Sequence, residues 1–296
     1  MKIAIYSRPT NKEGDDFISQ VVNFLLEKAA DISAFHTLPP LLTPTAQSSL
    51  SSTFTRKEEL AAIQPDFLFS IGGDGTFIDA ANLVGDSGIP ILGINTGRIG
   101  FLTNVNRNNF KEAFDFLQKS DYQLEKRSLL QIKSDNGDAL PASFALNDLS
   151  IHPHGDSINA VQVMANGEHL NTYWGDGLIM ATPTGSTAYS LSCGGPILVP
   201  SANVMVLTPI ASHSLTVRPI VLPTDNELKI KVESRSHRFI LSVDSHRITM
   251  NDDVTLTVNR APYTIATIRL PNADFYSVIR EKLLWGLDKR NFLDHE

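Results

Sequence analysis

The chain has 296 residues, of which 42% are apolar and 19% are charged, and its formal net charge is −7. This composition is typical of a globular protein of one or two domains with a sizeable core. The negative charge argues against nucleic acid or an anionic membrane surface as a partner. The single cysteine, Cys193, excludes an intramolecular disulfide and disfavours a cysteine-based zinc site.

The start of the chain passes directly into a strand pattern at residues 2–6, without the apolar core and cleavage site of a signal peptide. No apolar run approaches the ~18 residues that cross a bilayer. We therefore expect a cytoplasmic protein. From Phe17 to Leu26, apolar pairs four residues apart predict a helix, which we expect Asp15 and Asp16 to cap. Residues 36–56 are rich in Pro, Ser and Thr and predict a loop.

A glycine-rich turn, Gly72-Gly73-Asp74-Gly75-Thr76, separates an apolar strand pattern at 66–71 from a helix pattern that starts at Thr76. Glycines let a ligand approach the main chain closely, and the unpaired amides at a helix start attract anions. A carboxylate repels phosphate, so we interpret Asp74 as a base or a metal anchor beside bound phosphates. The alternative is a tight turn with Asp74 as a helix cap.

The next elements continue the alternation of strand and helix. Residues 89–95 predict a buried strand, 96–102 a glycine-punctuated turn, and 107–118 a helix. This order indicates a parallel sheet covered on both faces. Ligands of such sheets bind at the carboxyl ends of the strands, where the glycine turns lie.

From about Tyr122 the pattern changes to short strands. Asn166-Gly167 predicts a hairpin turn, and Leu228, Ile230 and Val232 alternate with polar residues. We therefore predict two domains. An α/β N-terminal domain with a parallel sheet spans 1–121, and a β-rich domain spans 122–271. A C-terminal helix, recognisable at 273–285 within about 272–296, is expected to pack back on the first domain.

Small and hydroxyl residues dominate 175–196, which suits a binding surface for a nucleotide better than a core. The alternative is a Ser/Thr-rich loop with a short helix. Asn147-Asp148 interrupts an apolar run and is either a bulge or turn, or a pair of acceptors for a sugar diol. The chain has no P-loop and no Gly-x-Gly-x-x-Gly fingerprint. His152 and His154 could flank a metal as alternate strand residues, but a solvated edge fits them better.

These motifs resemble those of the NAD kinase family, which phosphorylates the 2′-hydroxyl of the adenosine ribose of NAD. The glycine turn alone is also similar in lipid kinases and 6-phosphofructokinases, whereas the 175–196 block is highly specific. The matching segments appear in the family's order between Asp66 and about Pro223. They are 72–76, 93–95, 97–102, 145–148, 175–196, 208–210, 213–215 and 218–219.

The resemblance implies an α/β domain and a β-rich domain with NAD in the crevice between them. It also implies ATP as the phosphoryl donor (polyphosphate in some members), a divalent cation such as Mg²⁺ or Mn²⁺, and a homodimer or homotetramer. The two rival hypotheses are a lipid kinase of the diacylglycerol or sphingosine type, which shares the glycine turn, and a non-catalytic dinucleotide-binding regulator.

By match to the family, Asp74 is the expected general base and Gly75 lets the nucleotide approach. Asn147 and Asp148 would hold sugar hydroxyls, and Asp176 the nicotinamide end. The adenine side would be lined by Thr187, Ala188, Tyr189, Ser190, Leu191 and Ser192. Asp244 and His246 fall where the family often places a ligand contact, although this match is loose. No metal ligand is assigned.

Two positions depart from the family pattern. The family usually has Asn-Glu where this chain has Asn147-Asp148, so the shorter carboxylate needs a closer sugar or a bridging water. Trp174 stands where some members carry a charged residue, and an aromatic side chain there could stack on a ring of the ligand.

Overall fold

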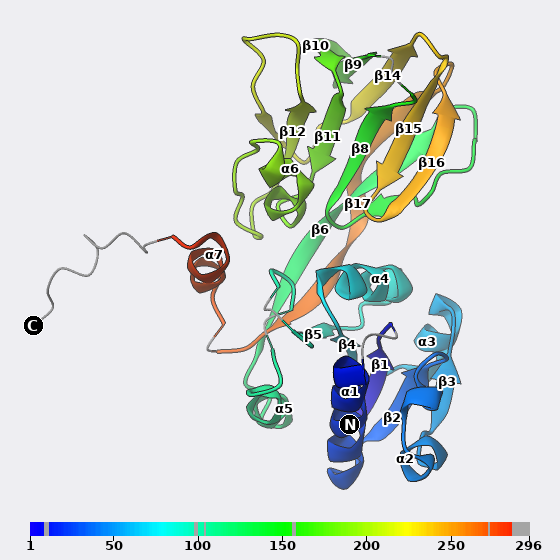
Figure 1. The fold of residues 1–296 in the computed structure, drawn as a ribbon, viewed down its shortest axis with the longest axis vertical. Helices are drawn as coiled ribbons and strands as arrows, with labels where there is room; N and C mark the ends of the chain where they lie inside the picture. Colours follow the sequence, from blue (N-terminus) through cyan, green and yellow to red (C-terminus); the bar gives the residue numbers. More distant parts are fainter. Residues whose placement is uncertain (9–11, 98–99, 104, 156–157, 272, 286–296) are drawn as a thin grey trace, which may run out of the picture. The chain divides into compact units, whose positions relative to one another are not determined.

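A computed structural model describes residues 1–8, 12–97, 100–103, 105–155, 158–271 and 273–285. The chain divides into two compact units (Figure 1): unit 1 comprises Met1–Lys126 and Ile265–Glu296, and unit 2 comprises Arg127–Thr264. Two long strands, β6 (Gln123–Ser134) and β17 (Thr255–Arg269), run from one unit into the other. No helix in the described part of the chain combines the length and apolar character that a membrane crossing requires.

Unit 1 is built on a parallel sheet with the strand order β3-β2-β1-β4-β5. The end of β17 lies beside β5, where Thr267 pairs with Ile91. Every residue of β4 and β5 is buried, as expected for central strands of a parallel sheet with both faces covered. The strands are β1 (Lys2–Tyr6), β2 (Asp31–Phe35), β3 (Ser52–Phe54), β4 (Phe67–Ile71) and β5 (Ile91–Ile94).

Helices α1, α2 and α5 bury apolar residues in the core that this sheet provides. Phe17 of α1 and Phe110 of α5 meet edge to face in that core, with ring centroids 6.5 Å apart. The helical segments are α1 (Lys12–Glu27), η1 (Pro39–Leu41), α2 (Pro44–Ser48), α3 (Lys57–Ile63), α4 (Asp74–Val84), η2 (Gly85–Ser87), α5 (Phe110–Gln118) and α7 (Phe275–Leu283).

Two predictions for unit 1 are wrong. Helix α1 begins at Lys12, so Asp15 lies inside its first turn and is not a cap. The 36–56 segment is not a featureless loop, since it contains η1, α2 and the edge strand β3. The Thr43 side chain accepts a hydrogen bond from the Ala46 N–H and starts α2. Short elements of three to five residues have no room for a hydrophobic period, so the sequence pattern missed them.

Unit 2 contains two sheets, with orders β10-β9-β14-β17 and β13-β12-β11-β8-β15-β16, whose apolar residues form one shared core. Strand β14 alternates buried and exposed residues without exception, which confirms the period of two. The predicted hairpin is also confirmed, because Asn166 (φ 51°) and Gly167 (φ 85°) connect β9 to β10.

The described elements of unit 2 that follow β6 are β7 (Phe144–Ala145), β8 (Asp148–Pro153), β9 (Asn159–Ala165), β10 (Glu168–Gly175), β11 (Gly177–Ala181), η3 (Gly185–Thr187), α6 (Tyr189–Ser192), β12 (Val204–Ile210), β13 (Ile220–Pro223), β14 (Leu228–Ser234), β15 (Arg238–Val243) and β16 (His246–Asn251).

Candidate functional site

The glycine turn of unit 1 lies at the carboxyl end of β4, between the carboxyl ends of the neighbouring parallel strands β1 and β5. Gly73 is the N-cap of α4, and Asp74 is the first helical residue. The first amides of α4 therefore point out of the carboxyl edge of the sheet, which is the arrangement that binds anions.

The Asp74 side chain turns away from its own helix and does not act as a cap. Its Oδ2 accepts a hydrogen bond from the Phe101 N–H (2.8 Å), and its Oδ1 accepts bonds from the Leu102 N–H (3.1 Å) and the Thr103 hydroxyl (3.2 Å). Three donors from one loop thus hold the carboxylate in a fixed orientation.

A short hydrogen-bond chain extends from Asp74 to the end of β5. The Asn95 amide donates to the Thr103 hydroxyl (2.8 Å), and the Asn95 side-chain oxygen accepts from the Gly97 N–H (2.6 Å). Asn95 and Thr103 are both buried. Sequence reasoning did not single out Thr103, which directly follows the matched segment 97–102. Arg98 and Ile99 of that segment lie outside the described residues.

Gly100 is needed for the close approach of this loop to Asp74. A Cβ atom at Gly100 would lie 1.9 Å from Asp74 Oδ1 and 2.4 Å from Thr103 Oγ1. By contrast, a Cβ atom at Gly97 in the same loop would approach only Asn95 Oδ1, at 3.9 Å. A side chain at position 100 would therefore clash with Asp74 and Thr103, whereas one at position 97 would not.

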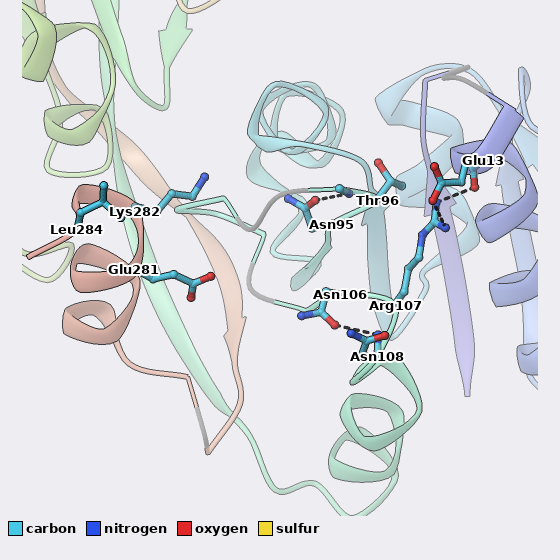
Figure 2. A pocket seen from close by; sticks show the side chains of 10 residues that line it. Glu13, Asn95, Thr96, Asn106, Arg107, Asn108, Glu281, Lys282 and Leu284 are labelled. Atoms are coloured by element: carbon cyan, nitrogen blue, oxygen red, sulfur yellow. Dashed lines mark hydrogen bonds and ion pairs between the residues drawn. The ribbon is translucent and has the colours of Figure 1, made fainter. Parts of the chain in front are cut away.

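Asn95 is one of the residues that line a polar cavity of about 840 Å³ in unit 1. Figure 2 shows Glu281 and Lys282 projecting from α7 toward the side of the cavity that Asn95 and Asn106 form. On the opposite wall, Arg107 makes an ion pair with Glu13 at 2.9 Å and also donates to the Glu13 carbonyl at 2.7 Å. The cavity thus offers amides and charges of both signs, next to the residue that connects to Asp74.

In unit 2, Asn147 lies in the turn between β7 and β8, and Asp148 begins β8. The Asp244 carboxylate accepts hydrogen bonds from the N–H groups of Leu146 (2.9 Å), Asn147 (2.8 Å) and Asp148 (3.2 Å). Asn147 therefore lies in a turn whose backbone is bonded to Asp244, and the binding of a sugar diol by the Asn147 and Asp148 side chains stays a prediction. Asp244 was expected to contact a ligand, but here its carboxylate is bonded to the backbone.

The 175–196 block packs against this turn. The Thr182 hydroxyl donates to the Leu146 carbonyl (2.5 Å), and the Thr182 N–H donates to the Asn147 carbonyl (2.9 Å). A Cβ atom at Gly185 would lie 2.1 Å from the Asn147 carbonyl oxygen, so η3 can approach the turn only with glycine there. The structure thus brings Asn147 and Asp148 together with the start of the block that holds residues 187–192.

The six residues of the predicted adenine side differ in accessibility. Ser190 is buried, and its hydroxyl is hydrogen-bonded to that of Thr208 at 2.8 Å. Tyr189 is 39% exposed, and its ring stacks on His152 with centroids 5.9 Å apart. Thr187, Ala188 and Leu191 are half-buried, and Ser192 is exposed. Five of the six can therefore present atoms to a ligand.

Asp176 directly precedes β11 and lies at the opposite end of that strand from the residue that pairs with Asp148. In the antiparallel pairing of β8 with β11, Asp148 is opposite Ala181, and Asp176 precedes Ala181 by five residues. That spacing corresponds to roughly 17 Å along a strand. Trp174, two residues before Asp176, lies next to the last residue of β10 and is 56% exposed. Within one chain these two residues are separate from the Asn147-Asp148 turn.

Burial, together with the nearby Asp244 carboxylate, raises the pKa of Asp148 to about 7. Between its unfolded pKa of 3.8 and the folded value of about 7, the folded chain binds more protons, so Asp148 makes stability fall as pH rises. At pH 8 the ionised group costs up to about 4 kcal/mol.

Asp148→Asn should therefore raise the free energy of unfolding at pH 8 by a few kcal/mol and by less at pH 5. Urea unfolding at the two pH values measures both effects. Asp253→Asn, which removes an exposed carboxylate of the same unit, is the matched control and should change neither value. Equal stability of Asp148→Asn and the wild type at pH 8 would contradict the assigned environment of Asp148.

The chain matches two family descriptions. Residues 3–122 match the ATP-NAD kinase N-terminal domain, and residues 146–270 match the ATP-NAD kinase C-terminal domain. The chain is 38% identical to an NAD kinase of Flavobacterium psychrophilum, across 98% of this chain and 100% of that one. It is 46% identical to an NAD kinase of Bacteroides fragilis, across 76% of this chain and 78% of that one.

Two solved structures share the fold at low sequence identity. Yeast NADH kinase complexed with NADH superposes with a TM-score of 0.86 at 22% identity, covering 97% of this chain and 88% of that one. An NAD kinase from Archaeoglobus fulgidus in complex with ATP superposes with a TM-score of 0.74 at 23% identity, covering 96% and 99%.

Proposed function

The chain belongs to the ATP-NAD kinase family, and we propose that Asp74 is the general base of its reaction. The activity is that of an NAD kinase, which forms NADP and ADP from NAD and ATP. The new bond joins the γ-phosphorus of ATP to the 2′-oxygen of the adenosine ribose, and the bond from that phosphorus to the β,γ-bridging oxygen breaks. Asp74 takes the hydroxyl proton, and ADP leaves.

The hydrogen bonds of Asp74 support this role. A carboxylate has about four acceptor positions. Three are used by Phe101, Leu102 and Thr103, two on Oδ1 and one on Oδ2. One position on Oδ2 is left for the substrate hydroxyl. A base held this way needs no reorientation when the substrate binds, which is the positioning that phosphoryl transfer requires.

For the donor, the first amides of α4 and the open space beside Gly75, where an added Cβ atom would meet no atom within 4 Å, support ATP phosphates beside Asp74. We assign the remainder of ATP to the cavity lined by Asn95, in which Arg107 and Lys282 are the cationic partners. Mg²⁺ is usually bound through substrate phosphates with one or two carboxylates. The proposal therefore assigns the cation to the ATP phosphates.

For NAD, we assign Asn147 and Asp148 to the ribose hydroxyls, because an amide oxygen and a carboxylate accept from a diol. The accessible residues of 187–192 are assigned to the adenine. Asp176, Trp174 and His246 remain predicted ligand contacts. The homodimer or homotetramer and the cytoplasmic location also remain predictions. The matches over both halves of the chain support neither the lipid kinase nor the regulator hypothesis.

The proposed function is tested with purified protein, ATP, Mg²⁺ and NAD, by following NADP formation through a coupled NADP-specific dehydrogenase. We expect NADP only when all three components are present. Folded protein that binds NAD and forms no NADP with ATP would contradict the assigned donor or the activity. Parallel reactions with NADH and with polyphosphate define the preferred acceptor and donor.

A further inference from the structure

We propose that Asp244 is a positioning residue: its carboxylate holds the Asn147-Asp148 turn in its binding conformation and makes no contact with NAD. The proposal rests on the proposed role of Asn147 and Asp148 in binding NAD. It assigns to Asp244 a different task from the ligand contact that the family match suggested.

Asp244 is bonded to the backbone of the whole Asn147-Asp148 turn. Its carboxylate accepts three consecutive backbone N–H groups, from Leu146, Asn147 and Asp148, at 2.8 to 3.2 Å. In return, the Asp244 N–H donates to the Asp148 carbonyl at 2.9 Å. Asp244 itself has φ 49°, a left-handed conformation that aspartate tolerates in the short connection between β15 and β16. The two turns therefore fix each other.

The other side of the turn is bonded to Thr182. Thr182 donates to the carbonyls of Leu146 and Asn147. Each backbone group of Asn147 is thus bonded to either Asp244 or Thr182. In the part of the chain that the structure describes, the side chains of Asn147 and Asp148 make no hydrogen bond to another residue. The backbone is used for structure, and the two side chains are left to bind a ligand.

Asp244 and Asp148 differ in the groups that stabilise their charge. Three N–H donors favour the ionised form of Asp244, although burial raises its pKa. Asp148 has no such donors, so the proton is taken up by Asp148, whose pKa is raised by burial and by Asp244. Tyr189 on α6 and Cys193 directly after that helix interact electrostatically with Asp148, and His246 on β16 does so with Asp244. His152 on β8 and Arg247 on β16 lie next, beside Tyr189.

Removing the charge of Asp244 should therefore change how kcat/KM for NAD depends on pH, whereas removing a purely structural residue should not. An ionised Asp148 accepts sugar hydroxyls, so kcat/KM for NAD in the wild type should fall as pH drops below about 7. We call the fall of kcat/KM at low pH the acid limb of the pH profile. Without the neighbouring charge, Asp148 ionises at lower pH, so the acid limb should shift to lower pH by about one unit.

The test measures KM for NAD, and kcat/KM from pH 5.5 to 9, in Asp244→Asn. An asparagine replaces one acceptor oxygen by a donor that faces backbone N–H groups. We expect KM to rise at least about tenfold and the acid limb to shift to lower pH. Asp148→Asn should lack this limb, which identifies its origin. Asp253→Asn removes a charge from an exposed turn of the same unit and should leave both quantities unchanged.

Asp244→Glu provides a second test if Asp244→Asn does not fold. It keeps the charge, but the longer side chain cannot place its oxygens on the same three N–H groups. We expect a raised KM with the acid limb near its wild-type position. A KM within about twofold of the wild type in either folded variant would overturn the proposal. So would an acid limb in Asp244→Asn that coincides with that of the wild type. A wild type that makes no NADP would instead refute the proposed function.

Discussion

Asp74→Asn should lower kcat by about 10²–10⁴-fold, the usual contribution of a general base, and leave the Kd for NAD within about threefold of the wild type. An amide cannot take the proton of the 2′-hydroxyl, whereas the assigned sugar and adenine contacts lie in unit 2 and are unchanged. Steady-state turnover and calorimetric NAD binding on the same preparation measure the two quantities.

The contacts of Asp74 add a second expectation. In the asparagine variant an NH₂ group must face the N–H of Phe101 or the two donors of Leu102 and Thr103, so at least one hydrogen bond is lost. This costs about 1–3 kcal/mol of stability. Urea unfolding therefore accompanies the kinetics. Asp86→Asn, an exposed position of unit 1, is the charge control and should match the wild type in both assays. Near-normal turnover in Asp74→Asn would remove Asp74 from the base role.

Gly100→Ala should reduce kcat by about tenfold to 10³-fold although it changes no polar group. The added Cβ would lie 1.9 Å from Asp74 Oδ1, so either the loop or the carboxylate must move. Displacement of a catalytic group by about 1 Å can cost 10²-fold in rate. The measurement is kcat at saturating ATP and NAD.

The matched control for this prediction is Gly97→Ala, whose Cβ meets only Asn95 Oδ1 at 3.9 Å. It should retain at least about half of the wild-type kcat. A folded Gly100→Ala variant as active as Gly97→Ala would show that the Asp74 orientation seen here is not the one used in turnover.

Much of the fold could be predicted because its signals are local. The run 66–71 followed by glycines and a helical period predicted β4 and α4 with small errors at their ends, and the strict alternation at 228–232 predicted β14. The missed elements are those with too few residues for a period, such as α2 and β3. The capping prediction at Asp15 failed because acidic residues also favour the first turn inside a helix.

The candidate site could be predicted only as far as its residues lie in motifs. Asp74, Asn147 and the 175–196 block are recognisable from residue types in order. Their partners are distant in sequence: Asp74 is held by Thr103, 29 residues away, and Asn147 by Asp244, 97 residues away. No local pattern identifies such pairs. The separation of Asp176 from Asp148 likewise follows from the pairing of β8 with β11, which the sequence does not encode in any one segment.

The most direct test of the account is the position of the transferred phosphoryl group. Wild-type protein with ATP, Mg²⁺ and NAD should yield a single new phosphomonoester on the 2′-oxygen of the adenosine ribose, in equal amount to ADP, as read by ³¹P and ¹H NMR. In the same experiment Asp74→Asn should form this product about 10²–10⁴ times more slowly. Phosphate on the 3′-oxygen, or inorganic phosphate in place of NADP, would contradict the assignment of Asp74 to the 2′-hydroxyl.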